Sequence, residues 1–320
     1  MLSTMSKTGT QSRRQRRQKR LNWKLLLSLF SLLFILSGLL LSHWLFVFRV
    51  TKSYSTSATA SIANNTVVYA SHFSLNSKKL QAQTVSVKNY QLTKRQGKRV
   101  LLAKITASDK TYFVKADSLT LNQTNTINQY VAQVGYPKVK VKSKDEGFSQ
   151  SSYKTASGNP KGIVIHDTGT EDSTIAAEVS YMKSSYEETG VFVHTFIDSS
   201  QILNIANVGQ MAQGAGAKAN PYYIQFEMTH VYTQADFANQ LANAAYYSAL
   251  MLKTYHLPVT KGQKDGSGTV WTHEMVSLYL GGTDHVDPTD YWSSTAKQLF
   301  GVDYDVDDFI ELIQAYYNSL

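Results

Sequence analysis

The 320-residue sequence contains no cysteine, and it contains no aspartate or glutamate before Asp109. The first absence excludes disulfide bonds and thiolate metal ligands, so the stability of the chain must come from a buried core. The second absence makes the charge distribution very uneven. Residues 51–145 carry 15 lysines and arginines against 3 acidic residues, whereas residues 158–320 carry 7 against 19. We therefore predict a basic part and an acidic part with separate partners.

A long uncharged stretch, residues 25–48, follows a basic segment, residues 1–24. A helix over this stretch would be about 36 Å long and would exceed the roughly 30 Å hydrocarbon core of a bilayer. We predict a single-pass transmembrane helix or signal anchor, with the basic segment in the cytoplasm and the rest outside. The basic residues are Lys7, Arg13, Arg14, Arg16, Arg17, Lys19, Arg20 and Lys24.

A secreted protein with a cleaved signal peptide is the alternative to this anchor. The string Ala58-Thr-Ala60 resembles a signal cleavage site, and cleavage near Ala60 would release the remainder of the chain. The apolar core of a signal peptide is usually about 7–15 residues long, which is shorter than the stretch found here. The length therefore favours an uncleaved anchor.

The acidic part, residues 158–320, mixes β-type and helical patterns. This mixture predicts an α/β domain with a mixed central β-sheet flanked by helices. The predicted strands lie near residues 162–166, 191–197 and 222–228, and the predicted helices lie at residues 173–184, 234–256 and 307–319.

Three residues of this part, His166, His273 and Asp287, are candidate ligands of one metal ion. His166 ends an apolar run that is typical of a buried strand, and His273 follows Thr272, a candidate helix N-cap. Asp287 lies in a glycine-rich loop. Catalytic zinc takes about three protein ligands and leaves one position for water. Since cysteine is absent, the third ligand must be a carboxylate or another imidazole, and Asp287 is the better choice.

Two other interpretations apply to these histidines. A lone histidine in an apolar strand is often a packed core residue. The pair His273-Glu274 also begins the zincin metalloprotease motif, which requires a second histidine four positions after the first. Position 277 is a serine, so the spacing excludes that motif.

Glu227 is the candidate for acid–base chemistry. In the run from Tyr222 to Met228, strand alternation places Gln225 and Glu227 on one face and the apolar side chains on the other. A glutamate on a central strand is rarely found without a role. The alternative is an exposed glutamate on a solvated sheet face.

The strings around these residues resemble a known enzyme family. They are Ile163-Val-Ile-His-Asp-Thr168, Val179-Ser-Tyr-Met-Lys183, Phe192-Val-His194, Trp271-Thr-His273 and Leu280-Gly-Gly-Thr-Asp-His-Val-Asp-Pro288. From residue 162 to about 292 the chain resembles the zinc-dependent N-acetylmuramoyl-L-alanine amidases of the peptidoglycan-recognition fold, in particular the amidase module of staphylococcal bifunctional autolysins. The resemblance implies a Gram-positive cell-wall hydrolase that cleaves the amide between N-acetylmuramic acid and L-alanine in peptidoglycan.

The resemblance also implies roles for individual residues. His166, His273 and Asp287 would hold one Zn²⁺, Glu227 would transfer protons, and His285 would donate to the oxyanion, where several relatives have lysine. The equivalent of His194 lines the substrate groove in this family, and the other predicted substrate contacts are Thr168, Gly214, Gly216 and Trp271. The two glycines could let a peptide stem approach closely, because glycine leaves room for a second backbone. The alternative for His194 is a histidine packed within the strand, and the alternative for the two glycines is a loop with no role in binding.

The segments between the anchor and the acidic part predict a second module. Residues 49–66 are rich in Ser, Thr, Ala and Asn and predict a linker, residues 67–122 favour a small β-rich module, and residues 123–157 predict a connector. The end of the module resembles bacterial SH3-like wall-binding repeats but lacks their Gly-Trp pair. Outside the membrane, the basic residues 51–145 would meet teichoic acids rather than nucleic acid. The alternative is that these basic residues form a solvated surface that binds no partner.

Two functions compete with the amidase. Proteins of this fold can bind muropeptides without catalysis, although that interpretation is weaker here because all three candidate ligands and Glu227 are present. A zinc endopeptidase that cuts stem peptides is the other alternative.

Overall fold

The computed structural model describes residues 23–320, so most of the predicted basic segment, residues 1–22, lies outside the described residues. The chain divides into two compact units, the first ending at Val47 and the second comprising Phe48–Leu320.

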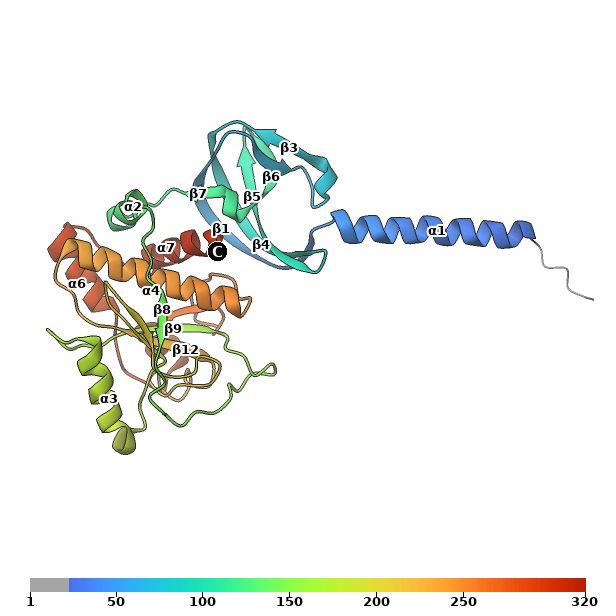
Figure 1. Ribbon diagram of the computed structural model, residues 1–320. Helices are drawn as coiled ribbons and strands as arrows, with labels where there is room; N and C mark the ends of the chain where they lie inside the picture. Colours follow the sequence, from blue (N-terminus) through green and yellow to red (C-terminus); the bar gives the residue numbers. More distant parts are fainter. Residues whose placement is uncertain (1–22) are drawn as a thin grey trace, which may run out of the picture. The chain divides into compact units, whose positions relative to one another are not determined.

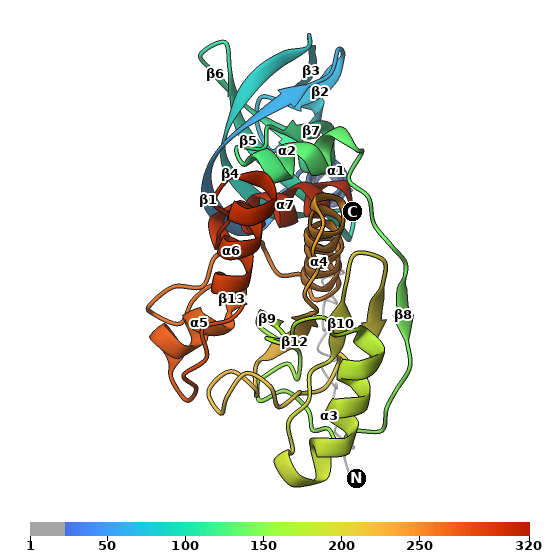
Figure 2. The ribbon, with the colours of Figure 1, turned by 90° about the vertical axis from the view of Figure 1, so that its left-hand side faces the viewer.

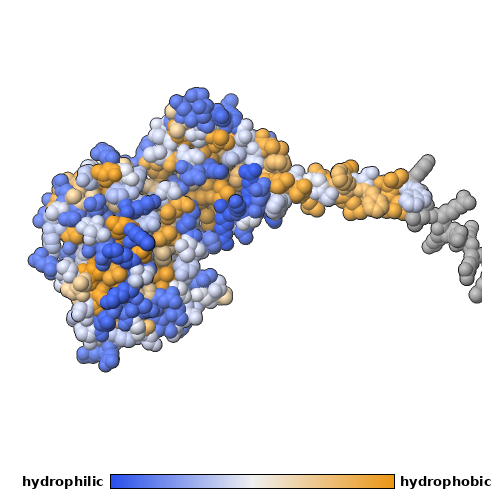
Figure 3. Space-filling model, in the orientation of Figure 1, coloured by the Kyte–Doolittle hydropathy of each residue, from blue (hydrophilic) through white to orange (hydrophobic). Residues whose placement is uncertain are grey.

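The first unit contains helix α1 (Trp23–Phe46). Its segment Leu25–Phe46 is, among the described residues, the one helix long and apolar enough to cross a membrane by length and composition. Large apolar side chains are exposed along it, as the hydrophobic surface in Figure 3 shows. A helix that is apolar all round is typical of a segment that is covered by a membrane or by other protein.

The second unit begins with a seven-stranded antiparallel sheet in the order β3-β2-β6-β5-β4-β1-β7 (Figure 1). Residues 67–122, predicted as a small β-rich module, lie within this sheet, which begins at Arg49; the SH3-like character of the module stays a prediction. The strands are β1 (Arg49–Ile62), β2 (Thr66–Tyr69), β3 (Ser77–Leu80), β4 (Gln83–Arg95), β5 (Lys98–Ala107), β6 (Lys110–Lys115) and β7 (Leu119–Leu121), with short 3-10 turns η1 (Ser74–Asn76) and η2 (Ala116–Ser118).

The prediction of a linker over residues 49–66 is wrong. Strand β1 pairs along its length with β4 and at its end with β7. Alternate residues turn inward, and Ala60 and Ile62 are buried. Small and β-branched residues suit a pleated surface when a partner strand covers them, and that long-range pairing is not visible in the local composition.

The predicted connector, residues 123–157, is also part of the packed structure. It contains helix α2 (Thr126–Gln133) and strand β8 (Val141–Ser143), which pairs with β11 (Ile202–Asn204). Tyr153 near its end is 3% exposed. The acidic part of the chain therefore needs residues upstream of 158 to complete its sheet.

This second sheet has six strands in the order β13-β9-β12-β10-β11-β8. It confirms the predicted mixed central sheet flanked by helices. Its other strands are β9 (Gly162–Asp167), β10 (Thr195–Ile197), β12 (Tyr223–Met228) and β13 (Val270–Thr272), and the helices are α3 (Ile175–Thr189), α4 (Gln234–Thr254), α5 (His273–Met275), which continues as the π-helical turn η3 (Val276–Leu280), α6 (Thr289–Phe300) and α7 (Val306–Ser319).

The two faces of this sheet pack against different helices (Figure 2). Ile163, Ile165 and Phe226 share one core with α4, whereas a separate core joins Phe196 of β10 to Ile175 of α3. Because side chains alternate along a strand, His166 and Glu227 fall on the face turned away from α4.

The basic and acidic parts are joined within the second unit. One hydrophobic core contains residues of both sheets. Asn318 of α7 donates to the Tyr90 hydroxyl of β4 at 3.2 Å, and the Thr124 amide donates to Glu311 of α7 at 3.0 Å. Two regions of opposite charge thus form one packed body.

Candidate metal centre and active site

Three parallel strands bring the candidate residues to one edge of the six-stranded sheet. Strand β9 lies between β13 and β12, His166 pairs in register with Glu227, and Ile165 pairs with Thr272. His273 follows Thr272 directly, and the Thr272 hydroxyl caps the helical turn by accepting from the Met275 amide. Since parallel strands end at the same edge, these side chains meet there.

The three predicted ligands converge. His166 Nδ1 lies 2.9 Å from His273 Nδ1 and 3.2 Å from Asp287 Oδ2, and His273 Nδ1 lies 3.0 Å from Asp287 Oδ1. Tetrahedral zinc ligands at about 2.0–2.1 Å from the metal are about 3.3 Å apart. The donor set and its spacing therefore fit a single Zn²⁺ ion, which would need only small shifts of these atoms.

Unpaired polar atoms support this fit. Glu227 Oε2 is buried and has no hydrogen-bond partner among the described residues, and the buried Asp287 Oδ2 has only its ion-pair contact with His166 Nδ1. A buried polar atom without a partner is costly and indicates a missing ligand or ion. A metal ion held by the two Nδ1 atoms and Asp287 would satisfy this carboxylate, and Glu227 Oε2 would lie beside it.

Surrounding contacts hold the ligands in place. Thr283 Oγ1 lies 2.9 Å from His273 Nε2 and can orient this imidazole. The Glu274 amide donates to the Asp287 carbonyl at 3.0 Å, and Ser277 Oγ donates to the His285 carbonyl at 2.7 Å. The loop that carries Asp287 is thus fixed to the turn that carries His273.

The electrostatics of the site favour metal-binding protonation states. Burial alone would raise the pKa of Asp287, but hydrogen bonds from His166 and His273 lower it well below its usual range. Burial lowers the pKa of His166, although the hydrogen bond and the negative charge of Asp287 raise it. A deprotonated carboxylate and a neutral imidazole are the forms that bind a metal ion.

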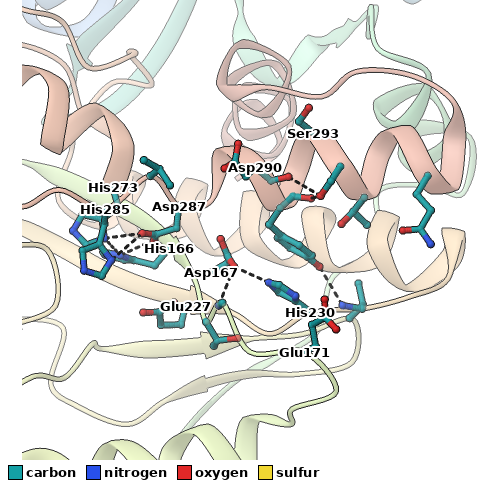
Figure 4. Close-up of a pocket in the computed structure, with 18 of the residues that line it drawn as sticks. His166, Asp167, Glu171, Glu227, His230, His273, His285, Asp287, Asp290 and Ser293 are labelled. Carbon is teal, nitrogen blue, oxygen red and sulfur yellow. Dashed lines mark hydrogen bonds and ion pairs between the residues drawn. The ribbon is translucent and has the colours of Figure 1, made fainter.

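Glu227 lies beside this cluster (Figure 4). Its pKa is raised well above the usual value, first by burial and then by the nearby carboxylates of Asp287 and Asp167. A carboxyl group that is held in a poorly solvated site and has a free oxygen is suited to accept and return a proton.

His285 occupies the solvent side of the cluster. Its side chain is 64% exposed, its Nδ1 lies 3.4 Å from Asp287 Oδ1, and its ring stacks on His273 with centroids 4.5 Å apart. It lines the same pocket as the candidate ligands. The structure therefore brings together all five residues predicted for catalysis and metal binding.

The pocket has a volume of about 1170 Å³ and extends from the candidate ligands to helix α6. Thr168 and Gly214, two predicted substrate contacts, line it. A second pair, not predicted from the sequence, lies in this pocket: His230 Nε2 is 2.7 Å from Asp167 Oδ2 (Figure 4). The His230 ring stacks on Tyr291. The sequence signal that could have indicated this pair is the position of Asp167 directly after His166.

Two predicted substrate contacts are core residues instead. His194 is fully buried; its Nδ1 accepts from the Gln225 amide at 3.0 Å and its Nε2 donates to the Gln210 carbonyl at 2.7 Å. Burial lowers the pKa of His194 to about 4, although its hydrogen bonds to the backbone act in the opposite direction and raise the pKa. Trp271 is also fully buried, with its indole donating to the Gly268 carbonyl. Neither side chain lines the pocket.

Gly216 also does not line the pocket but supports the metal loop. Its φ is +78°, and a Cβ atom there would lie 2.6 Å from the Gly282 carbonyl oxygen. Only glycine allows the two loops to approach this closely. The prediction that a peptide stem uses this space is wrong, because another loop of the chain fills it.

Known proteins resemble this chain in sequence and fold. The family model of N-acetylmuramoyl-L-alanine amidase matches residues 156–290. The chain is 38% identical to the Staphylococcus aureus hydrolase AmiA, whose structure was solved in complex with its ligand; the match has a TM-score of 0.56 and covers 61% of this chain and 91% of that one. The chain belongs to the N-acetylmuramoyl-L-alanine amidase family.

Longer relatives share the same region. Protein Ami of Listeria monocytogenes is 37% identical over 214 residues, which are 62% of this chain and 22% of that protein. The bifunctional autolysin of Staphylococcus aureus is 38% identical over 194 residues, which are 60% of this chain and 15% of the autolysin. The chain thus matches less than a quarter of the length of either protein.

Proposed function

We propose that this protein hydrolyses the amide bond between N-acetylmuramic acid and L-alanine in peptidoglycan. His166, His273 and Asp287 hold one Zn²⁺ ion in this proposal. Membership of the amidase family supports the substrate, and the convergence of the three ligand atoms beside Glu227 carries the mechanism. When bound, zinc supplies Lewis acidity and lowers the pKa of a coordinated water to about 7.

The remaining steps belong to side chains of the protein. Glu227 Oε2, which lacks a hydrogen-bond partner, accepts a proton from the attacking water and returns it to the departing L-alanine nitrogen. The exposed His285 imidazole donates to the oxyanion that forms when the carbonyl becomes tetrahedral. Thr168 and Gly214 line the groove and contact the substrate.

Product identification tests this function. Purified peptidoglycan digested with the full chain should release new L-alanine amino termini and no new reducing sugar ends. New amino termini from other residues would indicate an endopeptidase, and binding without any product would indicate a receptor. The Glu227→Gln variant controls for contaminating hydrolases, because it should bind the walls and release nothing.

We further propose that α1 anchors the chain in the membrane, with residues 49–320 outside the cell. The fold supports an uncleaved anchor, because Ala60 is fully buried in β1 between β4 and β7, and cleavage there would remove most of β1. A membrane fraction that releases the protein to detergent but not to high salt would support the anchor. A soluble protein lacking residues 1–60 would contradict it.

The basic residues 51–145 bind anionic wall polymers such as teichoic acids in this proposal, and nucleic acid is not a partner. The formal charge of this region and its extracellular position support the assignment. Walls stripped of teichoic acid should retain less of the protein than intact walls at low salt. Equal retention would contradict it.

A further inference from the structure

Three basic side chains lie directly opposite one another at one end of the seven-stranded sheet. Arg49 of β1 pairs with Lys94 of β4, and Lys94 pairs with Arg99 of β5. Residues opposed in this way share a face of the sheet, with Cβ atoms about 4.5–5.5 Å apart, and like charges in these positions are destabilising. This row of cations therefore favours a bound anion.

Among the described residues, the chain pairs no anion with this row, although Asp117 and the C-terminal residue Leu320 line a pocket together with Arg99. Lys52 lies close by along β1, Lys98 lies at the end of the same hairpin on the opposite face from Arg99, and no acidic residue occurs between Phe48 and Ser108. All five cations are exposed, and none forms an ion pair within residues 23–320. The end of the sheet thus presents five positive charges to solvent.

Protection of sheet edges does not explain the central charge of this row. Lysines often line edge strands, where they prevent association with another sheet. Lys94, however, is paired on both sides, with Arg49 and with Arg99, so it is not on an edge. Arg99 lies where β5 extends beyond β6, which pairs with β5 only from Leu102 onward. The row is better explained by a ligand that covers it.

Chain connectivity identifies the ligand. Only Val47 and Phe48 separate the end of α1 from Arg49, and three residues span at most about 11 Å. If α1 crosses the membrane, Arg49 must stay within that reach of the lipid headgroups, and Lys94 and Arg99 follow at strand spacings of about 4.8 Å. Basic residues beside a membrane are attracted to its anionic lipids, by several-fold in affinity for each charge.

We propose that the row formed by Arg49, Lys94 and Arg99, with Lys52, binds the phosphate groups of anionic lipids and docks the seven-stranded sheet on the outer surface of the membrane. Within the basic residues 51–145, this row is thus assigned to lipid, and the other cations remain assigned to wall polymers. This inference rests on the membrane anchor proposed above. Docking would hold the β4–β5 hairpin against the headgroups and would limit the region of cell wall that the active site can reach.

Fluorescence quenching in nanodiscs tests the docking. The full chain with Gln96→Cys carries a unique thiol at the tip of the hairpin, because the natural sequence has no cysteine. A fluorophore on this thiol reports contact with lipids that bear a quencher on the headgroup. We expect stronger quenching in discs containing phosphatidylglycerol than in pure phosphatidylcholine, and loss of the difference in 0.5 M NaCl, because salt screens exposed charges.

Two triple variants distinguish the effect of this row from the effect of net charge. Arg49→Gln, Lys94→Gln and Arg99→Gln together should lower the docking equilibrium constant in phosphatidylglycerol discs on the order of 100-fold at low salt. The matched control, Lys79→Gln, Lys88→Gln and Lys110→Gln, removes three exposed charges elsewhere on the sheet and should change docking little. Both variants should hydrolyse soluble muropeptides like the parent, which shows that they fold.

Several results would overturn the proposal. Equal quenching in both lipids, or equal losses in the two triple variants, would show that the row has no specific role. Displacement of the hairpin by soluble poly(glycerol phosphate) at the same phosphate concentration would assign the row to a wall polymer instead. Failure of the chain to enter nanodiscs would refute the membrane anchor itself, and the inference with it.

Discussion

The two sheets of the second unit place their polar residues differently. In the six-stranded sheet, β13, β9, β12 and β10 are parallel, so residues at their ends meet at one edge. In the antiparallel seven-stranded sheet, neighbouring strands end at opposite edges, and its charged residues form rows across exposed strands instead. The first arrangement concentrates catalytic groups at one point, and the second spreads charge for binding an extended anionic surface.

Removing a candidate ligand should have the largest effect. His166→Ala should reduce the bound zinc from about one ion per chain to almost none and should bring wall hydrolysis below detection, because catalytic zinc needs its three protein ligands. Elemental analysis of the purified protein and amine release from walls measure the two quantities. His256→Asn, at an exposed histidine outside the pocket, is the control and should retain both.

Glu227→Gln should separate chemistry from metal binding. The substitution keeps the shape of the side chain but removes the proton acceptor, so kcat should fall about 10²–10⁴-fold. Zinc content should not change, because Glu227 is not among the three candidate ligands. A variant that loses zinc would make Glu227 a ligand rather than a base.

His285→Ala should have a smaller effect on kcat. Loss of one oxyanion donor costs roughly 10²-fold in kcat or somewhat more, and His285→Lys should recover part of it, because lysine can also donate. Steady-state kinetics on a soluble muropeptide measure both variants. A change in KM alone would place His285 in substrate binding instead.

His194→Ala should affect stability rather than catalysis. The substitution leaves the Gln225 amide and the Gln210 carbonyl without their partner, so the free energy of unfolding should fall by about 2–4 kcal/mol. Denaturant unfolding measures this loss. Below the unfolding transition, KM should match that of the parent; a raised KM would restore His194 to the substrate groove.

Tyr90→Phe should have the smallest effect. It removes only the hydrogen bond between β4 and Asn318 of α7, and the free energy of unfolding should fall by about 0.5–1.5 kcal/mol. The two sheets should still unfold in one transition, since they share a core. Two separate transitions in the parent protein would show that the sheets are independent domains.

The sequence predicted the catalytic half better than the rest. Strand alternation placed Glu227 correctly, and the end of an apolar run located His166, because these signals are local. His194 has the same local signal, but burial in three dimensions made it a core residue. Strand β1 was missed because its partners β4 and β7 come later in the chain and its composition is polar. The Asp167–His230 pair depends on strand register, which composition does not reveal.

Anomalous diffraction at the zinc edge from crystals of the full chain tests the central claim most directly. The predicted result is one peak per chain, about 2.0–2.1 Å from His166 Nδ1, His273 Nδ1 and an Asp287 carboxylate oxygen. A peak at any other site, or no peak in protein that hydrolyses walls, would contradict the account.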